Sequence, residues 1–567
     1  METKKENMNQ EKESAKLPKE IIEKLFPNEL PTPEELEKKY PPRDLPKDAM
    51  VTRFGPSPTG FVHIGGLYAE ILAKWFARQT KGVSFLRIED TDELREIPGA
   101  KELIVKALDI FDISPDEGPS VSGEEKGKYG PYTQSERPTI YQAFAKKLVE
   151  EGKAYPCFMT NEELEKQRGK QTEEKIRPGY RGEWAKWRDA LPEKIEEELS
   201  KGTPFVIRLR ANGVHEKRIV VVDEIKGTME LPENDIDDVI LKSNGLPPYG
   251  FAHVVDDHLM GTTHVTRGVD WLPQTPFHLE LFSALGFKPP KYAHFGNILK
   301  EDGKNEKGDI KLRKISKRLD PEANAMKYIE WGYPTDAVIQ YLLNMMNSDF
   351  EDKEWRKNNP DAPLSEFEIS FKKLEPHAKG SLFDFVKLND ISKDIISRMT
   401  AEEIYGKGLV WAKEYDAKLA EEMEKNPEYT KSILNIERLG EARGRKDIGK
   451  WADLNPEIGY FFDDIFDEIK LDVEMKDRDI AVQKFLETYN ENDTKDEWFA
   501  KVKDIARDLG YAEGAKQFKQ EPEKYKGQVG DIAKIFRVLL TGKTNTPDLH
   551  SIMKVMGKER VTRRLNM

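Results

Sequence analysis

Two short segments, far apart in the chain, carry side chains suited to binding phosphate groups. Residues 53–66 have the sequence RFGPSPTGFVHIGG, and residues 314–318 have the sequence KISKR. In the first segment glycines allow close backbone approach, a following helix would offer free N–H groups, and His63 can donate to a phosphate oxygen. In the second, cations surround Ser316 and can stabilise the charge that separates on pyrophosphate. Each segment alone also fits an ordinary turn, but together they predict a nucleoside triphosphate site.

A third polar stretch lies between these segments, at residues 248–258, with the sequence PYGFAHVVDDH, and is followed by Arg267. We expect this stretch on a strand of a resumed sheet, with Arg267 at the end of the next strand. A buried guanidinium can meet a carboxylate through two parallel hydrogen bonds, and breaking such a pair costs about 3–5 kcal/mol. The pattern therefore predicts a small anionic substrate. A structural ion pair between Arg267 and Asp256 or Asp270 explains the same residues equally well.

The elements that must position the first segment follow the order strand, loop, helix, strand. Strands are expected at residues 50–54 and 83–89, and a helix at residues 67–80, where apolar residues share one face. Because such βαβ units are right-handed, the loop at residues 55–66 would lie at the carboxyl edge of a parallel sheet, where ligands bind. Glu89, at the end of the second strand, would flank the same crevice.

After residue 129 the chain changes character, which indicates an α+β insertion into the first fold. The insertion is predicted to contain helices at residues 141–152 and 192–201 and strands at 205–210 and 219–223. The parallel sheet is then expected to resume, with strands at 239–241, 252–255 and 292–295 and a helix at 275–285. Beyond about residue 383 the pattern becomes almost wholly helical, which predicts a separate all-α region.

The composition is that of a soluble, multidomain protein of 567 residues with 34% charged residues and a mean hydropathy of −0.71. The net charge of −13 does not exclude nucleic acid, because 91 basic residues can form local patches. The single cysteine, Cys157, excludes an internal disulfide and any zinc site with two or more thiolates, and it fits a reducing cytoplasm. No apolar run approaches the length needed to span a bilayer, so we expect no membrane association.

In combination, several motifs resemble class I aminoacyl-tRNA synthetases of the glutamyl type. Besides the two phosphate segments, they are FLRIEDTD, YTQSER and VVDDH, at residues 85–92, 132–137 and 254–258. The resemblance covers nearly everything from about residue 50 to the end. It implies a Rossmann-type α/β catalytic domain with an α+β insertion, followed by an all-α anticodon-binding region of the bacterial type.

The resemblance and the local composition together predict the domain organisation. Residues 1–47 would be an N-terminal extension, mobile or loosely docked, with a helix around residues 18–25. The further domains are expected to be the first half of the catalytic domain at 48–128, an acceptor-binding insertion at 129–245, the second catalytic half at 246–310, a stem-contact region with the KISKR loop at 311–382, and two parts of the anticodon-binding helical domain at 383–465 and 466–567.

The resemblance implies a two-step reaction in which ATP activates glutamate to glutamyl-adenylate, and the glutamyl group then passes to the 3′-terminal adenosine of tRNA(Glu). It leaves tRNA(Gln) open as a second acceptor, and implies Mg²⁺ with ATP, no structural zinc, a monomer and a cytoplasmic location. Catalysis would rest on positioning and charge stabilisation by His63, Lys314 and Lys317. The expected ATP-binding residues are His63, Gly65, Gly66, Lys314, Ser316, Lys317 and Arg318. The expected glutamate-binding residues are Arg53, Ser57, Glu89, Tyr249, His253 and Arg267, with Glu89 facing the amino group.

In the helical region, Arg443 and Arg445 align by resemblance with an anticodon-reading segment, although a solvated helix end explains them equally well. Two other functions stay open. One is a truncated relative that modifies a queuosine base in tRNA, which residues 383–567 disfavour. The other is a non-catalytic RNA-binding paralogue, which the retention of Glu89 and the phosphate-segment residues disfavours.

Overall fold

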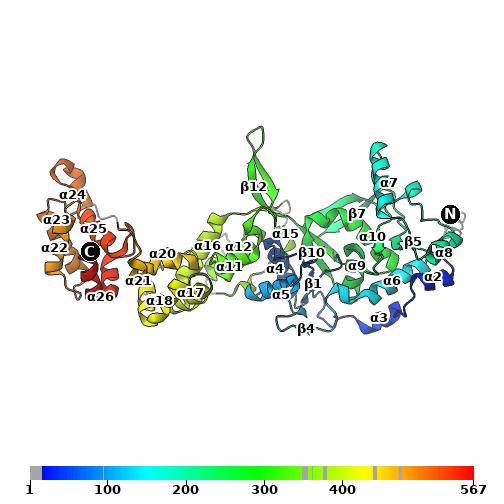
Figure 1. The fold of residues 1–567 in the computed structure, drawn as a ribbon, viewed down its shortest axis with the longest axis horizontal. Helices are drawn as coiled ribbons and strands as arrows, with labels where there is room; N and C mark the ends of the chain where they lie inside the picture. Colours follow the sequence, from blue (N-terminus) through cyan, green and yellow to red (C-terminus); the bar gives the residue numbers. More distant parts are fainter. Residues whose placement is uncertain are drawn as a thin grey trace. The chain divides into compact units, whose positions relative to one another are not determined.

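The computed structural model describes residues 16–92, 95–347, 355–359, 362–374, 380–438, 444–471 and 476–567 (Figure 1). The chain divides into two compact units, which are treated separately below. The first unit consists of the residues up to Met326 together with Leu342–Phe383, and the second of Lys327–Tyr341 together with Asp384–Met567. Within the described ranges, no helix is both long and apolar enough to cross a membrane.

The first unit begins its sheet with the predicted βαβ arrangement. Strand β1 (Val51–Phe54) pairs in parallel with β2 (Val83–Leu86), and helix α4 (Ile64–Gln79) connects them. The predicted apolar face of α4 is buried against the sheet. The helix starts earlier than expected because the His63 side chain accepts a hydrogen bond from Gly65 N, which caps the first turn. Helix α5 (Ala100–Ile110) and the short strands β3 (Gly118–Pro119) and β4 (Glu125–Lys126) follow.

The sheet resumes with β10 (His264–Gly268) and β11 (Lys291–Phe295), which are parallel and joined by α10 (Thr275–Leu285). Paired hydrogen bonds between Val51 and Thr263 link β1 to the start of β10. The strand order β10-β11-β7-β8 brings in a hairpin, β7 (Arg218–Asp223) and β8 (Gly227–Pro232), from the insertion. The strand predicted at residues 219–223 therefore extends the catalytic sheet, because β7 runs parallel to β11.

The strand predicted at residues 252–255 is wrong, because this stretch lies in helix α9 (Tyr249–Leu259). The apolar run is buried on all sides, and a short run of this kind does not distinguish a strand from a buried helix. Helical spacing is visible instead in the polar residues, since His253 lies one turn from both Tyr249 and Asp257. The third polar stretch therefore reaches the site from a helix.

The insertion forms its own antiparallel sheet, with the order β5-β6-β9. Its strands are β5 (Ala154–Cys157), β6 (Val206–Leu209) and β9 (Val239–Leu241). The strand predicted at 239–241 thus belongs to this antiparallel sheet and not to the parallel one. The helices of this region are α6 (Pro138–Glu150), α7 (Asn161–Glu173) and α8 (Pro192–Ser200).

The helix predicted around residues 18–25 is confirmed, but from residue 18 onward the N-terminal segment is not the mobile or loosely docked extension that its charged composition predicts. It forms helices α2 (Lys19–Leu25) and α3 (Pro33–Lys39), whose apolar side chains are buried in the core shared with α6 and the insertion. Arg43 donates twice to the Glu117 carboxylate, at 2.9 and 2.8 Å, and packs 3.9 Å from the centre of the Tyr129 ring. The predicted mobility was wrong because the few apolar residues that form the buried face of these helices are outnumbered by lysines and glutamates.

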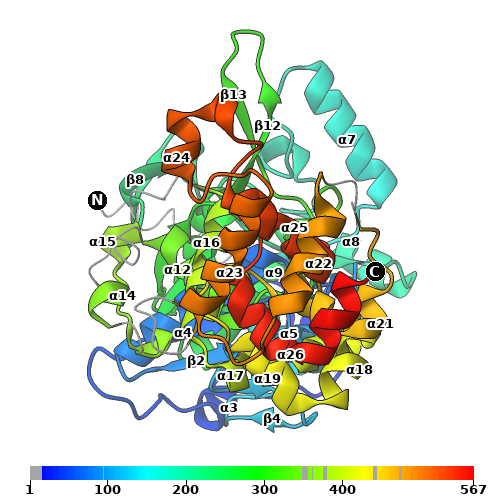
Figure 2. The same ribbon diagram turned by 90° about the vertical axis from the view of Figure 1, so that its left-hand side faces the viewer.

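A two-stranded hairpin carries the second phosphate segment. Strands β12 (Ile298–Lys304) and β13 (Ile310–Lys314) are antiparallel and project from the first unit in both views (Figure 1, Figure 2). At its base, β12 also pairs with β14 (Ser381–Leu382). The remaining helices before β14 are α11 (Ala325–Glu330), α12 (Thr335–Met346), α14 (Trp355–Asn358) and α15 (Phe371–Leu374).

After β14 the second unit contains no strand among its described residues, in agreement with the all-α prediction. A continuous apolar core runs from Ile396 to Leu565 and buries aromatic side chains such as Trp451 and Phe536. Its α-helices are α16 (Phe385–Arg398), α17 (Ala401–Tyr415), α18 (Ala417–Lys425), α19 (Pro427–Leu434), α20 (Leu454–Ile458), α21 (Asp463–Phe466), α22 (Arg478–Thr488), α23 (Lys495–Asp508), α24 (Ala515–Gln520), α25 (Val529–Thr541) and α26 (Leu549–Leu565).

Candidate active site

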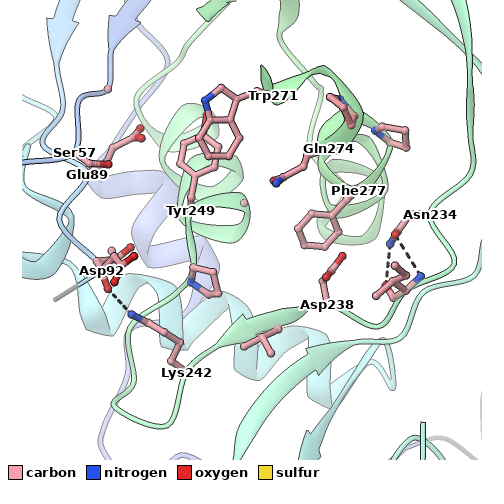
Figure 3. Close-up of a pocket in the computed structure, with 18 of the residues that line it drawn as sticks. Ser57, Glu89, Asp92, Asn234, Asp238, Lys242, Tyr249, Trp271, Gln274 and Phe277 are labelled. Carbon is pink, nitrogen blue, oxygen red and sulfur yellow. Dashed lines mark hydrogen bonds between the residues drawn. The ribbon is translucent and has the colours of Figure 1, made fainter. Parts of the chain in front are cut away.

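A cleft of about 1120 Å³ lies in the first unit, at the carboxyl ends of β1, β2 and β10 and against the insertion. Ser57 and Glu89 come from the sheet side, Tyr249 and Trp271 from the resumed half, and Asp238 from the insertion (Figure 3). Of the predicted glutamate-binding residues, the cleft is lined by Arg53, Ser57, Glu89, Tyr249 and Arg267. The sixth, His253, does not line it.

The acidic side of the cleft centres on Glu89, which is 7% exposed. Arg87 Nη2 donates to Glu89 Oε1 at 2.9 Å, yet burial raises the pKa of Glu89 and outweighs the lowering by Arg87 and Arg53. Gly55 leaves room for this carboxylate, since a Cβ at that position would come within 2.3 Å of Glu89 Oε1. The arrangement places a carboxylate on the cleft wall, where it can accept hydrogen bonds from a ligand ammonium group.

The basic side centres on Arg267, which is only 4% exposed. Among the described residues, no carboxylate lies within ion-pair distance of its guanidinium. Asp256 is instead held by Arg137 Nε and the Tyr141 hydroxyl, each at 2.8 Å, and Asp270 pairs with Lys314. The structural ion-pair explanation of Arg267 is therefore wrong for both proposed partners. A buried guanidinium without a carboxylate is suited to an anionic ligand.

Tyr249 lies between two guanidinium groups. Its hydroxyl oxygen accepts from Arg53 Nη2 and from Arg267 Nη1, both at 3.3 Å. Its ring packs against Trp271, with 4.1 Å between the ring centres. Arg53 also approaches Asp257, at 3.6 Å from Nε to Oδ2, so the two arginines differ in having or lacking an acidic neighbour.

His253 is fully buried behind the cleft and not in it. Its Nδ1 lies 2.7 Å from Asp257 Oδ2, and its Nε2 lies 3.1 Å from the Tyr292 hydroxyl. Burial lowers the pKa of His253 to about 3, so the imidazole is neutral at physiological pH. Its contacts support Asp257 and Tyr292 and give it no path to a ligand in the cleft.

The structure brings together the two segments that were predicted to bind phosphate. His63 Nδ1 accepts from Gly65 N at 2.9 Å, so the ring proton is on Nε2, which faces the Ile315 carbonyl oxygen at 3.3 Å. Burial, together with the charges of Lys317 and Lys314, lowers the pKa of His63 to about 4 despite the hydrogen bond to Ile315, so the ring is a neutral donor. Gly66 packs closely as well, since a Cβ there would lie 3.3 Å from the Phe54 ring.

The KISKR loop is fixed at its centre while its cations reach outward. Ile315 is 1% exposed, and Ser316 N donates to Asp320 Oδ2 at 2.8 Å. Lys314 forms an exposed ion pair with Asp270, and Lys317 Nζ lies 3.4 Å from Thr59 Oγ1, where burial lowers its pKa. The Arg318 side chain is exposed, and its backbone N–H donates to Ser316 Oγ at 3.3 Å.

Other residues of the site escaped sequence reasoning. Arg87 binds both Glu89 and Asp257. The sequence indicated this role only by placing Arg87 two residues before Glu89 in FLRIEDTD. Trp271 and Asp238 carried no signal, because they become neighbours of the cleft only through the fold. In the part of the chain that the structure describes, no cluster of three or more His, Cys, Asp or Glu side chains could hold a metal ion.

In the helical unit, Arg443 lies outside the described residues. Arg445 lies in a loop, with a side chain only 8% exposed and its Nε 2.7 Å from Asp447 Oδ2. A solvated helix end therefore does not describe Arg445.

The parallel sheet with two phosphate segments at one edge, its insertion and the helical second unit define a class I tRNA synthetase. Residues 49–382 match the family described as tRNA synthetases class I (E and Q), catalytic domain, and residues 418–567 match the Anticodon binding domain. Within that class, the chain belongs to the glutamate–tRNA ligase family.

The similarity to members of that family extends over nearly the full length. The chain is 46% identical to the glutamate–tRNA ligase of Sorangium cellulosum, over 94% of this chain and 97% of the relative. It is also 46% identical to the glutamate–tRNA ligase of Clostridium perfringens strain 13, over 95% and 98% of the two chains. A crystal structure of a glutamate tRNA ligase from Elizabethkingia meningosepticum, in complex with its amino acid, superposes with a TM-score of 0.70 at 25% identity, covering 92% of this chain and 99% of the other.

Proposed function

We propose that the chain activates glutamate with ATP to glutamyl-adenylate and then passes the glutamyl group to the 3′-terminal adenosine of tRNA(Glu), as a glutamate–tRNA ligase. The observation that carries the proposal is Arg267, a buried guanidinium without a carboxylate partner among the described residues, on the same cleft as Glu89. Glutamate supplies the carboxylates and the ammonium group that these two side chains require.

In the proposed complex the cleft binds the amino acid by charge. Arg267 and Arg53 meet its carboxylates, Glu89 accepts from its ammonium group, and Ser57 adds a hydroxyl at the mouth. The Tyr249 hydroxyl accepts a hydrogen bond from each of these guanidinium groups. His253 belongs to the support of this pocket, because it contacts Asp257 and not the cleft.

The first reaction needs no covalent nucleophile from the protein. An oxygen of the glutamate α-carboxylate forms a bond to the α-phosphorus of ATP, the bond to the bridging oxygen breaks, and pyrophosphate leaves. The proposed role of His63, Lys314 and Lys317 is to orient the phosphates and stabilise the departing charge. Gly65, Gly66, Ser316 and Arg318 complete the proposed ATP site. Mg²⁺ would accompany ATP as a counterion and offset part of its charge.

The two lysines lie close to the proposed amino-acid site. Lys317 lies near Thr59, which itself lines the cleft, and Lys314 is held by Asp270, next to the cleft residue Trp271. The neutral His63 ring can donate from Nε2 once its contact with Ile315 is exchanged for a phosphate oxygen. Binding of ATP is thus proposed to replace contacts made within the protein.

The proposal assigns tRNA to the remaining regions. Residues 129–245 would receive the acceptor end, residues 311–382 the stem, and the two helical parts, 383–465 and 466–567, the anticodon. Arg443 and Arg445 are proposed to read anticodon bases, for which Arg445 would exchange Asp447 for a base edge. We further propose a cytoplasmic monomer without structural zinc.

The deciding experiment is aminoacylation of purified tRNA(Glu) and tRNA(Gln), side by side, with ATP and glutamate. Formation of glutamyl-tRNA on tRNA(Glu) is expected, and its absence would rule the proposal out. The tRNA(Gln) reaction decides whether the enzyme discriminates between the two. Pyrophosphate exchange is expected to require tRNA, so vigorous exchange without RNA would contradict that part of the proposal.

A further inference from the structure

Three buried polar side chains lie side by side on three neighbouring strands of the catalytic sheet. Asp223 ends β7, His294 is on β11, and Arg267 is on β10, in a strand order of β10-β11-β7. Arg267 and His294 are direct partners in the parallel register. Their exposed fractions are 2%, 0% and 4% for Asp223, His294 and Arg267. The chain of contacts therefore runs across the sheet toward the cleft.

The chain begins at a carboxylate that is held from several sides. Asp223 Oδ1 accepts from the backbone N–H groups of Ile225 at 3.0 Å and Lys226 at 2.8 Å, and the backbone N–H of His294 lies 3.1 Å from Oδ2. Burial alone would raise the pKa of Asp223, but the hydrogen bonds from His294 and these backbone groups hold it below its ordinary value. Asp223 is therefore an ionised anchor with a fixed orientation.

The anchor determines which nitrogen of His294 carries the proton. His294 Nδ1 lies 2.6 Å from Asp223 Oδ2, so Nδ1 is the protonated donor. Nε2 keeps its lone pair and accepts from Arg267 Nε at 2.9 Å. Burial lowers the pKa of His294 and the charge of Arg267 lowers it further, despite the bond to Asp223, so the ring is neutral.

The remaining contacts of Arg267 are longer and involve neutral groups. Its terminal nitrogens reach the Tyr249 hydroxyl and His278 Nδ1 at 3.3 Å, Thr275 Oγ1 at 3.2 Å and the Trp271 carbonyl at 3.4 Å. The shortest hydrogen bond of the guanidinium is thus the one from Nε to His294. A neutral imidazole orients the guanidinium without forming an ion pair, and so leaves its charge for a ligand.

We propose that Asp223 and His294 are positioning residues that orient Arg267 to receive a carboxylate of the substrate. The inference rests on the proposed function, because it takes that carboxylate to belong to glutamate. Neither residue lines the cleft, so both act through Arg267. A carboxylate in direct contact with Arg267 would neutralise its charge. The neutral His294 ring between Asp223 and Arg267 orients the guanidinium and leaves its charge unpaired.

Two substitutions at one position separate positioning from simple structural support. His294→Asn keeps a donor for Asp223 but lacks an acceptor at the place of Nε2, whereas the longer side chain of His294→Gln can place an oxygen near it. His294→Asn is expected to raise KM for glutamate about tenfold or more, with KM for ATP within about twofold. His294→Gln is expected to restore most of the loss. Asp223→Asn should resemble His294→Asn, because an amide can donate to Nδ1 and favour the wrong tautomer.

The matched control is His264→Asn at the other end of β10, whose ring contacts Thr263 and Phe371. It should leave KM for glutamate unchanged in aminoacylation of tRNA(Glu). Equal losses in His294→Asn and His294→Gln, or a parallel rise of KM for glutamate and ATP, would overturn the positioning role. If the unaltered protein forms no glutamyl-tRNA, the proposed function fails and this inference with it. An active protein with an unchanged KM in His294→Asn overturns the inference alone.

Discussion

The proposed amino-acid half and the proposed nucleotide half of the site are built in opposite ways. Around Arg267, Glu89 and Asp257 the charged groups are nearly or fully buried, and hydrogen bonds fix them from behind. Lys314 is held at the surface by Asp270, and Lys317 by Thr59 and the Phe61 ring, while only the centre of the loop is buried. Burial strengthens electrostatic interactions and penalises an unpaired charge, whereas exposed pairs are screened and contribute little.

The difference indicates two modes of binding. The amino-acid half is organised before its ligand arrives, which suits discrimination between small, similar molecules. The nucleotide half can exchange its contacts for those of a triphosphate that is itself highly charged. Substitutions should therefore affect the first half through affinity for one substrate, and the second half through the rate of chemistry.

The largest effect is expected from Arg267→Ala. Loss of a buried guanidinium that pairs with substrate should raise KM for glutamate roughly 100-fold or more, since breaking such a pair costs about 3–5 kcal/mol. KM for ATP should change little. Steady-state aminoacylation at varied glutamate and ATP concentrations measures both, with Arg218→Ala, an exposed arginine on β7, as the control. A comparable rise in both constants would remove the contrast between the halves.

A large effect on rate is expected from Lys317→Ala. Removal of a cation that stabilises departing pyrophosphate should slow adenylate formation about 100-fold, with tRNA affinity nearly unchanged. Pyrophosphate exchange in the presence of tRNA and equilibrium binding of tRNA measure the two quantities. Lys311→Ala, an exposed lysine on the same hairpin, is the control. Equal losses in rate and in tRNA affinity would show that the loop serves RNA docking instead.

A smaller effect is expected from Asp270→Asn, which breaks the exposed pair with Lys314. Both side chains are about half exposed, so the free energy of unfolding should change by less than about 1 kcal/mol. KM for ATP should shift by only a few-fold, because the freed lysine remains near the site. Denaturant unfolding and ATP-dependent kinetics test this, with Asp302→Asn on β12 as the control. A stability loss of several kcal/mol would show that the nucleotide half is also organised in advance.

Glu70→Gln is expected to change the pH dependence of stability and to leave catalysis unchanged. Glu70 lies in α4, fully buried, and neither carboxylate oxygen has a hydrogen-bond partner among the described residues. Burial raises its pKa well above the ordinary value, so the folded protein keeps a proton that the unfolded chain releases. The free energy of unfolding therefore falls as the pH rises above the ordinary pKa of a glutamate. The fall is about 1.4 kcal/mol per pH unit until the Glu70 carboxyl ionises in the folded protein.

Glutamine cannot ionise, so the melting temperature of Glu70→Gln should increasingly exceed that of the unaltered protein between pH 5 and pH 8. Thermal unfolding at several pH values measures this, with Glu102→Gln, an exposed glutamate of α5, as the control. A constant difference across that range would contradict the prediction.

The features that could be predicted from the sequence have local signatures, whereas those that could not depend on contacts between distant segments. The βαβ unit and the meeting of His63 with the KISKR loop were predictable, because glycines, a helix start and a basic loop have local signatures. Residues 252–255 were misassigned because a short run buried on all sides has no visible period. The partners of Arg267 were undecidable from sequence. Arg267 meets His294 only because β10 pairs with β11, and Asp223 reaches His294 only because β7 also pairs with β11.

The N-terminal helices have a consequence for how this protein is made. Arg43 Nε donates to the Met260 carbonyl at 2.7 Å, across a sequence separation of 217 residues. At a synthesis rate of roughly 5–20 residues per second, Arg43 waits roughly 10–40 s for this partner. The apolar residues of α2 must also wait, because they pack against α6 and α8, which follow much later in the chain. The surrounding lysines and glutamates favour solubility of the segment during that time. The same charged residues that obscured the buried face of these helices in the sequence therefore favour solubility of the segment before its core has been synthesised.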